Sequence, residues 1–150
     1  MSKTKKTIDV INFIDEEKSK HNLAVDTDCS NLKSKLENLG YKVMSFPKGL
    51  SDEDVNSLLI DNKVKYFMTK NKDDFVVFRN ALPSPTYHLI RLSSSVFGNV
   101  DQLARVIEKA MMFDSRIKGV PNVLDIDSMY MDNLSKLIKL AKTSQRKKER

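Results

Sequence analysis

The order of apolar and amphipathic segments in this sequence predicts an α/β fold, a three-layer sandwich with a mainly parallel central sheet. Apolar runs of strand length alternate with helical patterns, and such alternation is typical of parallel strands joined by crossover helices. The chain has 150 residues, 40% of them hydrophobic and 31% charged, which is enough for one core and hardly for two. With one Cys and two His, the composition excludes a disulfide framework and a multi-Cys zinc site.

The first half of the predicted domain supplies two strands, each followed by a helix. The first strand is Leu23–Val25, and the second is Tyr41–Phe46, in which apolar and polar residues alternate. Between them we expect a helix that Ser30 caps and Gly40 closes. Ser51 caps the next helix, and the acids of its first turn suit the helix dipole.

The second half continues the alternation. Val64–Met68 and Tyr87–Leu92 are apolar strands, and Val100–Met111 matches the helical template closely. The pattern after Pro121 is weaker and is followed by a last helix. One face of this helix is apolar and could dock onto a partner or a second copy of the chain, as a homodimer; it carries Leu134, Leu137, Ile138 and Ala141.

We expect three parts: a basic arm and short helix over 1–21, the α/β domain over 22–113, and a basic helical extension over 114–150. The extension has nine basic and five acidic residues, most of the formal net charge of +6, and would attract a polyanion such as RNA. A solvated helix face explains the same charges. The nucleic-acid-binding candidates are Lys70, Lys136, Lys139, Lys142, Arg146, Lys147 and Lys148. No membrane span or secretory signal is evident, so a cytoplasmic location is expected.

Acidic side chains follow three of the predicted strands. Asp26 and Asp28 come after the first strand, Asp52 opens the helix after the second, and Asp73 and Asp74 come after the third, with the neutral amide of Asn71 beside them. The carboxyl ends of parallel strands meet at one edge of the sheet, where ligands bind in such folds. Several carboxylates there would favour Mg²⁺ or Mn²⁺, which prefer oxygen ligands and assist phosphodiester hydrolysis. Local capping and turn formation could also explain each acid singly.

Four stretches occur in a characteristic order. They are Leu23-Ala24-Val25-Asp26, Leu39-Gly40-Tyr41-Lys42-Val43, Ser51-Asp52-Glu53-Asp54-Val55 and Met68-Thr69-Lys70-Asn71-Lys72-Asp73-Asp74-Phe75. This order resembles the PIN-like nuclease domains of the Mut7-C / DUF5615 type. The last stretch is the most specific, because its spacing matches the Thr-x-Asn-x-x-Asp-Phe turn found across PIN domains. The resemblance covers about half the chain.

The resemblance implies a metal-dependent endoribonuclease, in which a metal-bound hydroxide attacks an RNA phosphodiester. It implies that Asp26, Asp52 and Asp74 hold Mg²⁺ or Mn²⁺, with Asp28 as a further ligand. Glu53 takes the place of Asp52 if the register differs by one residue.

The resemblance also implies supporting roles and partners. Asn71 would orient water or a neighbouring carboxylate, and Thr69 would bond the acidic cluster or the scissile phosphate. Asn71 stands where many family members have Asp, which removes one negative charge. Many such proteins resemble toxins of toxin–antitoxin pairs, so an inhibitory antitoxin protein is an expected partner.

Two other functions fit parts of the sequence. Asp26-Thr27-Asp28 after an apolar strand mimics the nucleophile motif of haloacid-dehalogenase-like phosphatases, although Ser30 stands where that motif usually has Thr or Val. A catalytically weak PIN-like scaffold could instead bind RNA or a protein partner without cutting.

Overall fold

The computed structural model describes the chain from the first strand onward. The described residues are 22–70, 73, 75–76, 86–117 and 119–149, of which 141–149 are described as backbone. The expected N-terminal helix, Asn71 and Asp74 lie outside them.

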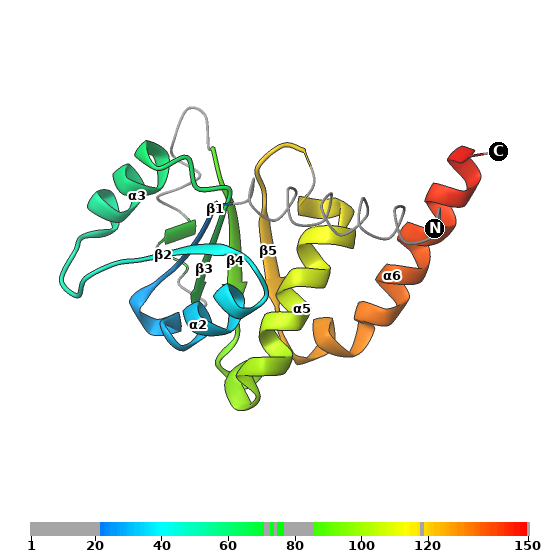
Figure 1. Cartoon of the computed structure of the whole chain (residues 1–150), viewed down its shortest axis with the longest axis horizontal. Helices are drawn as coiled ribbons and strands as arrows, with labels where there is room; N and C mark the ends of the chain where they lie inside the picture. The colour runs from blue at the N-terminus through cyan, green and yellow to red at the C-terminus, as the bar shows by residue number, and fades with distance from the viewer. Residues whose placement is uncertain (1–21, 71–72, 74, 77–85, 118, 150) are drawn as a thin grey trace, which may run out of the picture.

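The described chain forms an α/β fold around a sheet of five parallel strands (Figure 1). The strands are β1 (Asn22–Val25), β2 (Lys42–Ser45), β3 (Tyr66–Lys70), β4 (His88–Leu92) and β5 (Val123–Ile126). Their order in the sheet is β2-β1-β3-β4-β5. The chain places β2 on one side of β1 and then adds β3, β4 and β5 in turn on the other side, so the strand order reverses between β1 and β3. In parallel sheets the crevice outside the carboxyl ends of the strands at such a reversal is the usual ligand site.

Helices and short 3₁₀ turns connect the strands. They are α2 (Asn31–Asn38), α3 (Asp52–Asp61), α5 (Val100–Phe113) and α6 (Ser128–Glu149), with 3₁₀ turns η1 (Thr27–Cys29), η2 (Ser94–Gly98) and η3 (Ser115–Ile117). The Ser51 side chain accepts a hydrogen bond from the Asp54 amide, as expected of a cap. The cap predicted at Ser30 is absent, because its side chain makes no cap hydrogen bond. The turn η1 runs directly into α2, so the backbone of Ser30 is already helical.

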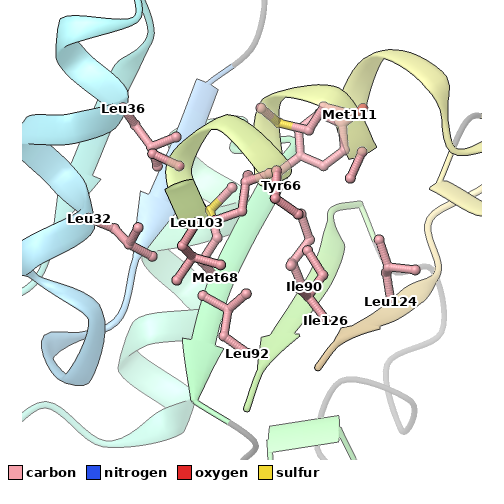
Figure 2. Close-up of a cluster of buried hydrophobic side chains, with 14 of the residues drawn as sticks. Leu32, Leu36, Tyr66, Met68, Ile90, Leu92, Leu103, Met111, Leu124 and Ile126 are labelled. Carbon is pink, nitrogen blue, oxygen red and sulfur yellow. The ribbon is translucent and has the colours of Figure 1, made fainter. Parts of the chain in front are cut away.

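Helices cover both faces of the sheet. One face packs against α2, α5 and α6, and its core includes Leu32, Leu103 and Ile90 (Figure 2). The other face packs against α3 through a second cluster that includes Leu59 and Phe67. The three-layer architecture predicted from the sequence is therefore confirmed.

The segment after residue 113 is part of this architecture and is more than a helical extension. β5 lies at the edge of the sheet and pairs in parallel with β4. Leu134 of α6 is buried in the same cluster as the buried side chains of α5, and Leu137 and Ile138 pack against that cluster. The described part of the apolar face of α6 is thus covered by its own chain, which removes the reason to invoke a partner or a second copy for these three residues. No helix among the described residues is long and apolar enough to cross a membrane.

Candidate functional site at the carboxyl edge of the sheet

Asp26 lies directly after β1, beside the point where the strand order reverses. The residue is only 8% exposed. Oδ1 accepts a hydrogen bond of 2.8 Å from the Thr27 amide, which makes Asp26 the cap of η1. The Asp26 amide donates to the carbonyl of Met68 at 2.9 Å, so the backbone is still paired with β3 at this position. The sheet and the turn together fix where the carboxylate points.

Thr69 of β3 holds the other oxygen of the same carboxylate. Its hydroxyl donates to Oδ2 of Asp26 at 2.8 Å, and its side chain is fully buried. The pairing of Val25 with Met68 places Asp26 and Thr69 side by side in the next position of the parallel register. The two residues are 43 positions apart in sequence and meet because their strands are neighbours in the sheet.

The register extends this pair into a row of polar residues along the carboxyl edge. Thr69 pairs with Arg91 of β4, and Arg91 pairs with Asp125 of β5. We call Asp26, Thr69, Arg91 and Asp125 the polar row. Successive residues of a strand point to opposite faces, so the row shares a face with residues two positions earlier. Those earlier residues are Ala24, Phe67 and Leu89, which belong to the cluster beneath α3, and Val123, which packs against it.

Arg91 carries the positive charge of the polar row. Its Nε donates to Oδ1 of Asp125, and its Nη2 donates to Oδ2 of Asp125 at 2.9 Å. Its Nη1 donates to Oδ1 of Asp73. Hydrogen bonding to Asp125, aided by the negative charge of Asp73, raises the pKa of the guanidinium although partial burial opposes it. The Asp73 side chain is 83% exposed, whereas that of Arg91 is 20% exposed. The guanidinium is therefore fixed on the β5 side and reaches solvent beside Asp73.

The other described members of the predicted ligand set are more exposed than Asp26. Asp28 is exposed in η1, where Oδ1 accepts a 3.5 Å hydrogen bond from the Thr27 hydroxyl. Asp52 and Glu53 are exposed in the first turn of α3, the helix that follows β2. No three His, Cys, Asp or Glu side chains among the described residues are grouped closely enough to hold a metal ion. The predicted ligand set thus depends on Asp74, which lies outside those residues.

The basic candidates lie at increasing distances from the polar row. Lys70 ends β3, and its ammonium lies 4.6 Å from the centre of the Phe97 ring. Lys136 and Lys139 are exposed on α6. Because α6 begins just after β5 and rises 1.5 Å per residue, Lys136 is about 12 Å and Lys148 about 30 Å along the helix from this edge. The remaining basic candidates, Lys142, Arg146 and Lys147, follow further along α6, which extends away from the sheet (Figure 1).

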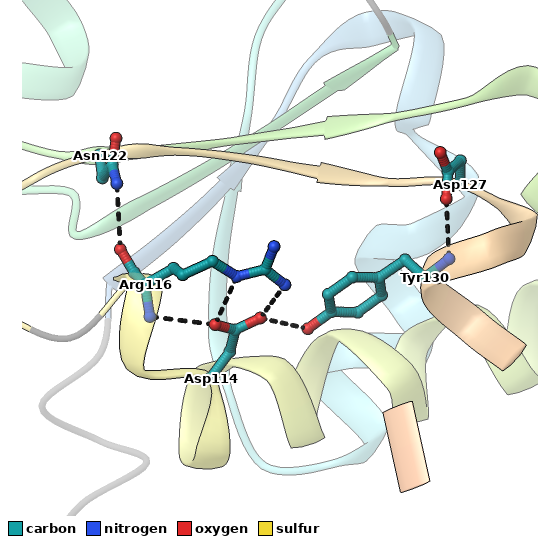
Figure 3. Close-up of polar contacts among 5 residues, drawn as sticks. All are labelled: Asp114, Arg116, Asn122, Asp127 and Tyr130. Atoms are coloured by element: carbon teal, nitrogen blue, oxygen red, sulfur yellow. Dashed lines mark hydrogen bonds and ion pairs between the residues drawn. The ribbon is translucent and has the colours of Figure 1, made fainter. Parts of the chain in front are cut away.

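A second buried acid, Asp114, lies just beyond the end of α5 (Figure 3). The Arg116 guanidinium donates to both of its oxygens, at 3.0 and 2.7 Å, and the Tyr130 hydroxyl donates to Oδ2 at 2.8 Å. Burial acts to raise the pKa of Asp114, but these hydrogen bonds and the charge of Arg116 outweigh it, so the pKa is lowered. The cluster ties α5 to the first turn of α6.

Sequence reasoning identified Asp26 and Thr69 but missed Arg91, Asp125 and Asp114. Arg91 and Asp125 each stand one position before the last residue of a short, mostly apolar strand. A charged residue at that position in two strands is a signal that could have been used, because parallel strands bring equivalent positions together.

Comparison of the chain with protein-family models, with curated proteins and with solved structures finds no match. The geometry of the carboxyl edge and the motifs that form it are therefore the features that point to a function.

Proposed function

We propose that this protein is a Mg²⁺- or Mn²⁺-dependent endoribonuclease of the PIN-like type, with Asp26 at the centre of its site. The observation that supports the proposal best is the position of Asp26. It is a buried carboxylate beside the reversal in strand order, and Thr27 and Thr69 each bind one of its oxygens. Hydrogen bonds from two sides hold the carboxylate in one orientation, and a ligand held in one orientation suits a hard divalent ion.

In this proposal the acids at the carboxyl edge share one divalent ion. Asp26 would be its central ligand, Asp52 and Asp74 would complete the set, and Asp28 would be an additional ligand. Oxygen donors of this kind suit Mg²⁺ and Mn²⁺, and such an ion, when bound, activates water and stabilises charge on a phosphoryl group. Thr69 would keep the Asp26 carboxylate oriented toward the ion, and Asn71 would orient water.

RNA is the proposed substrate because the basic residues of α6 give a polyanion an electrostatic approach to the protein. The distances along α6 mean that its lysines would contact nucleotides remote from the one being cut. An enzyme of this kind would act in the cytoplasm, and inhibition by an antitoxin-like protein belongs to the same proposal.

A second candidate function is RNA binding without cleavage, as a PIN-like scaffold. The observation that favours it is the pairing of Arg91 with both Asp73 and Asp125. An internal cation that already neutralises two acids of the carboxyl edge reduces the need for a metal ion there.

A Mn²⁺ titration of the full chain separates these candidates. We expect Mn²⁺ to raise the Tm of the wild-type protein and to support cleavage of a single-stranded RNA, because a ligand that binds only the folded state at 100 times its Kd stabilises it by about 2.7 kcal/mol. Asp26→Asn should remove the Mn²⁺-dependent rise in Tm and reduce cleavage by at least about 100-fold.

The matched control is Asp101→Asn, which removes one carboxylate from an exposed ion pair with Lys35. This variant should behave as the wild type in both measurements. If Mn²⁺ leaves the wild-type Tm unchanged and no RNA is cut, while RNA still binds, the endoribonuclease proposal fails in favour of the scaffold. Hydrolysis of p-nitrophenyl phosphate with no cleavage of RNA would instead favour the phosphatase.

A further inference from the structure

We propose that Arg91 is a phosphate-binding residue of the carboxyl edge, held in place by Asp125 and covered by Asp73 until a phosphate replaces that carboxylate. The inference rests on the proposed function for one point, that the phosphate belongs to RNA. It assigns a role to a residue that the metal-ligand set does not include.

The geometry of the polar row supports this role. Thr69 separates Asp26 from Arg91 in the register, and neighbouring strands lie about 4.8 Å apart, so the two Cα atoms are about 10 Å apart. Thr69 is fully buried between them, and the Arg91 guanidinium is directed toward Asp125 and Asp73, so a phosphate reaches it from the solvent side, beside Asp73. A guanidinium also binds phosphate through paired hydrogen bonds.

The two acids that bind Arg91 are not equivalent. Asp125 is the neighbour of Arg91 in the register, and it receives two of the three hydrogen bonds that the guanidinium donates to carboxylates. Asp73 receives one of these bonds, comes from the segment after β3, and is 83% exposed. Exposed ion pairs contribute little free energy, so a phosphate can displace Asp73 while Asp125 keeps the guanidinium oriented.

Lys35 and Asp101 provide a matched ion pair elsewhere on the molecule. Their side chains are 39% and 70% exposed and lie 3.0 Å apart, joining α2 to the first turn of α5. These helices cover the sheet face opposite to that of the polar row. Variants of this pair make the same changes of charge as variants of Arg91 and Asp73 at a site that should not contact the ligand.

The test measures binding of a fluorescein-labelled oligouridylate by fluorescence anisotropy in EDTA, where no metal-dependent cleavage occurs. Arg91→Gln should weaken binding by roughly 10-fold or more, because it removes charge-assisted hydrogen bonds to a phosphate, and it should reduce the salt dependence by about one phosphate contact. Arg91→Lys should fall between Arg91→Gln and the wild type, since it keeps the charge and loses the paired geometry. Asp73→Asn should tighten binding by about 2- to 5-fold.

The changes in oligouridylate binding caused by Lys35→Gln and Asp101→Asn measure the effect of net charge alone. If Arg91→Gln weakens binding no more than Lys35→Gln does, or if the wild type does not bind the oligouridylate, the role of Arg91 is disproved. Cleavage by the wild type with unchanged binding by Arg91→Gln would disprove this role and leave the endoribonuclease proposal standing. Binding that depends on Arg91, in a protein without Mn²⁺-dependent cleavage, would support the role of Arg91 and disprove the endoribonuclease.

Discussion

Asp26 and Asp114 are both buried carboxylates, but the fold binds them in different ways. Asp114 receives hydrogen bonds from the guanidinium of Arg116 and from Tyr130, and a positive charge therefore lies against it within the fold. The hydrogen bonds described for Asp26 come from neutral donors, the Thr69 hydroxyl and Thr27. Asp114 joins α5 to α6, whereas Asp26 lies directly after β1 in the sheet.

This difference shows that burial alone does not identify a functional carboxylate. A buried charge must be compensated, and the identity of the compensating group indicates the role. Arg116 compensates Asp114 permanently, so Asp114 can act as a structural tie. For Asp26, the Thr27 amide and the Thr69 hydroxyl orient the carboxylate, and the proposed function assigns it to a divalent ion. The comparison predicts that substitutions of the two residues will affect different measurements.

The largest difference should appear in the free energy of unfolding of the two Asp→Asn variants. Arg116 donates to both oxygens of Asp114, so in Asp114→Asn the amide NH2 faces a donor of Arg116 in either orientation, and we expect a loss of about 2–3 kcal/mol. In Asp26→Asn the amide can donate to the Thr69 hydroxyl while the carbonyl still accepts from Thr27, so the loss should stay below about 1 kcal/mol. Urea unfolding at neutral pH without divalent ions measures both.

The Mn²⁺ response should show the reverse pattern. Asp114→Asn should keep the Mn²⁺-dependent rise in Tm, and Asp26→Asn should lose it. If Asp26→Asn costs as much stability as Asp114→Asn, Asp26 is a structural tie as well, and the contrast between the two acids does not hold.

A smaller effect is expected from Thr69, which orients the Asp26 carboxylate. Thr69→Val keeps the shape of the buried side chain but removes the hydroxyl that donates to Oδ2. A buried carboxylate oxygen that loses its donor should cost about 1–2 kcal/mol of stability, and the affinity for Mn²⁺ should fall with it. Thr69→Ser is the control, because it keeps the hydroxyl. Equal Mn²⁺ affinities for the Val and Ser variants would argue against an orienting role.

The sequence predicted most of the fold because hydrophobic periodicity reports directly on burial. Leu23–Val25 and Tyr87–Leu92 are largely apolar runs, as strands covered on both faces should be, and β1 and β4 match them to within one residue. The strand Val123–Ile126 was missed for a physical reason. It has four residues, one of them is the charged Asp125, and its edge position requires less apolar character than a central strand.

The candidate site could be predicted only as far as strand order determines it. Asp26 and Thr69 were found because the ends of neighbouring parallel strands converge. The pairing of Arg91 with Asp125 depends on the register between β4 and β5, and a segment with a weak pattern does not reveal its register. Asp114 and Arg116 are close in sequence, but the contribution of Tyr130 depends on how α6 packs against α5.

The smallest predicted effect concerns the pH dependence of the Asp114 cluster. Because hydrogen bonds from Arg116 and Tyr130 outweigh burial and lower the pKa of Asp114 in the folded protein, the carboxylate stabilises the fold at any pH above its unfolded value. That contribution should be lost as the pH falls through the lowered folded pKa. The difference in unfolding free energy between wild type and Asp114→Asn should therefore be constant near neutral pH and shrink in acid. Tyr130→Phe should cost about 1 kcal/mol and keep this dependence, since the ion pair with Arg116 remains. Urea unfolding of the three proteins across acidic pH tests this, and a difference that grows in acid would mean that burial dominates at Asp114.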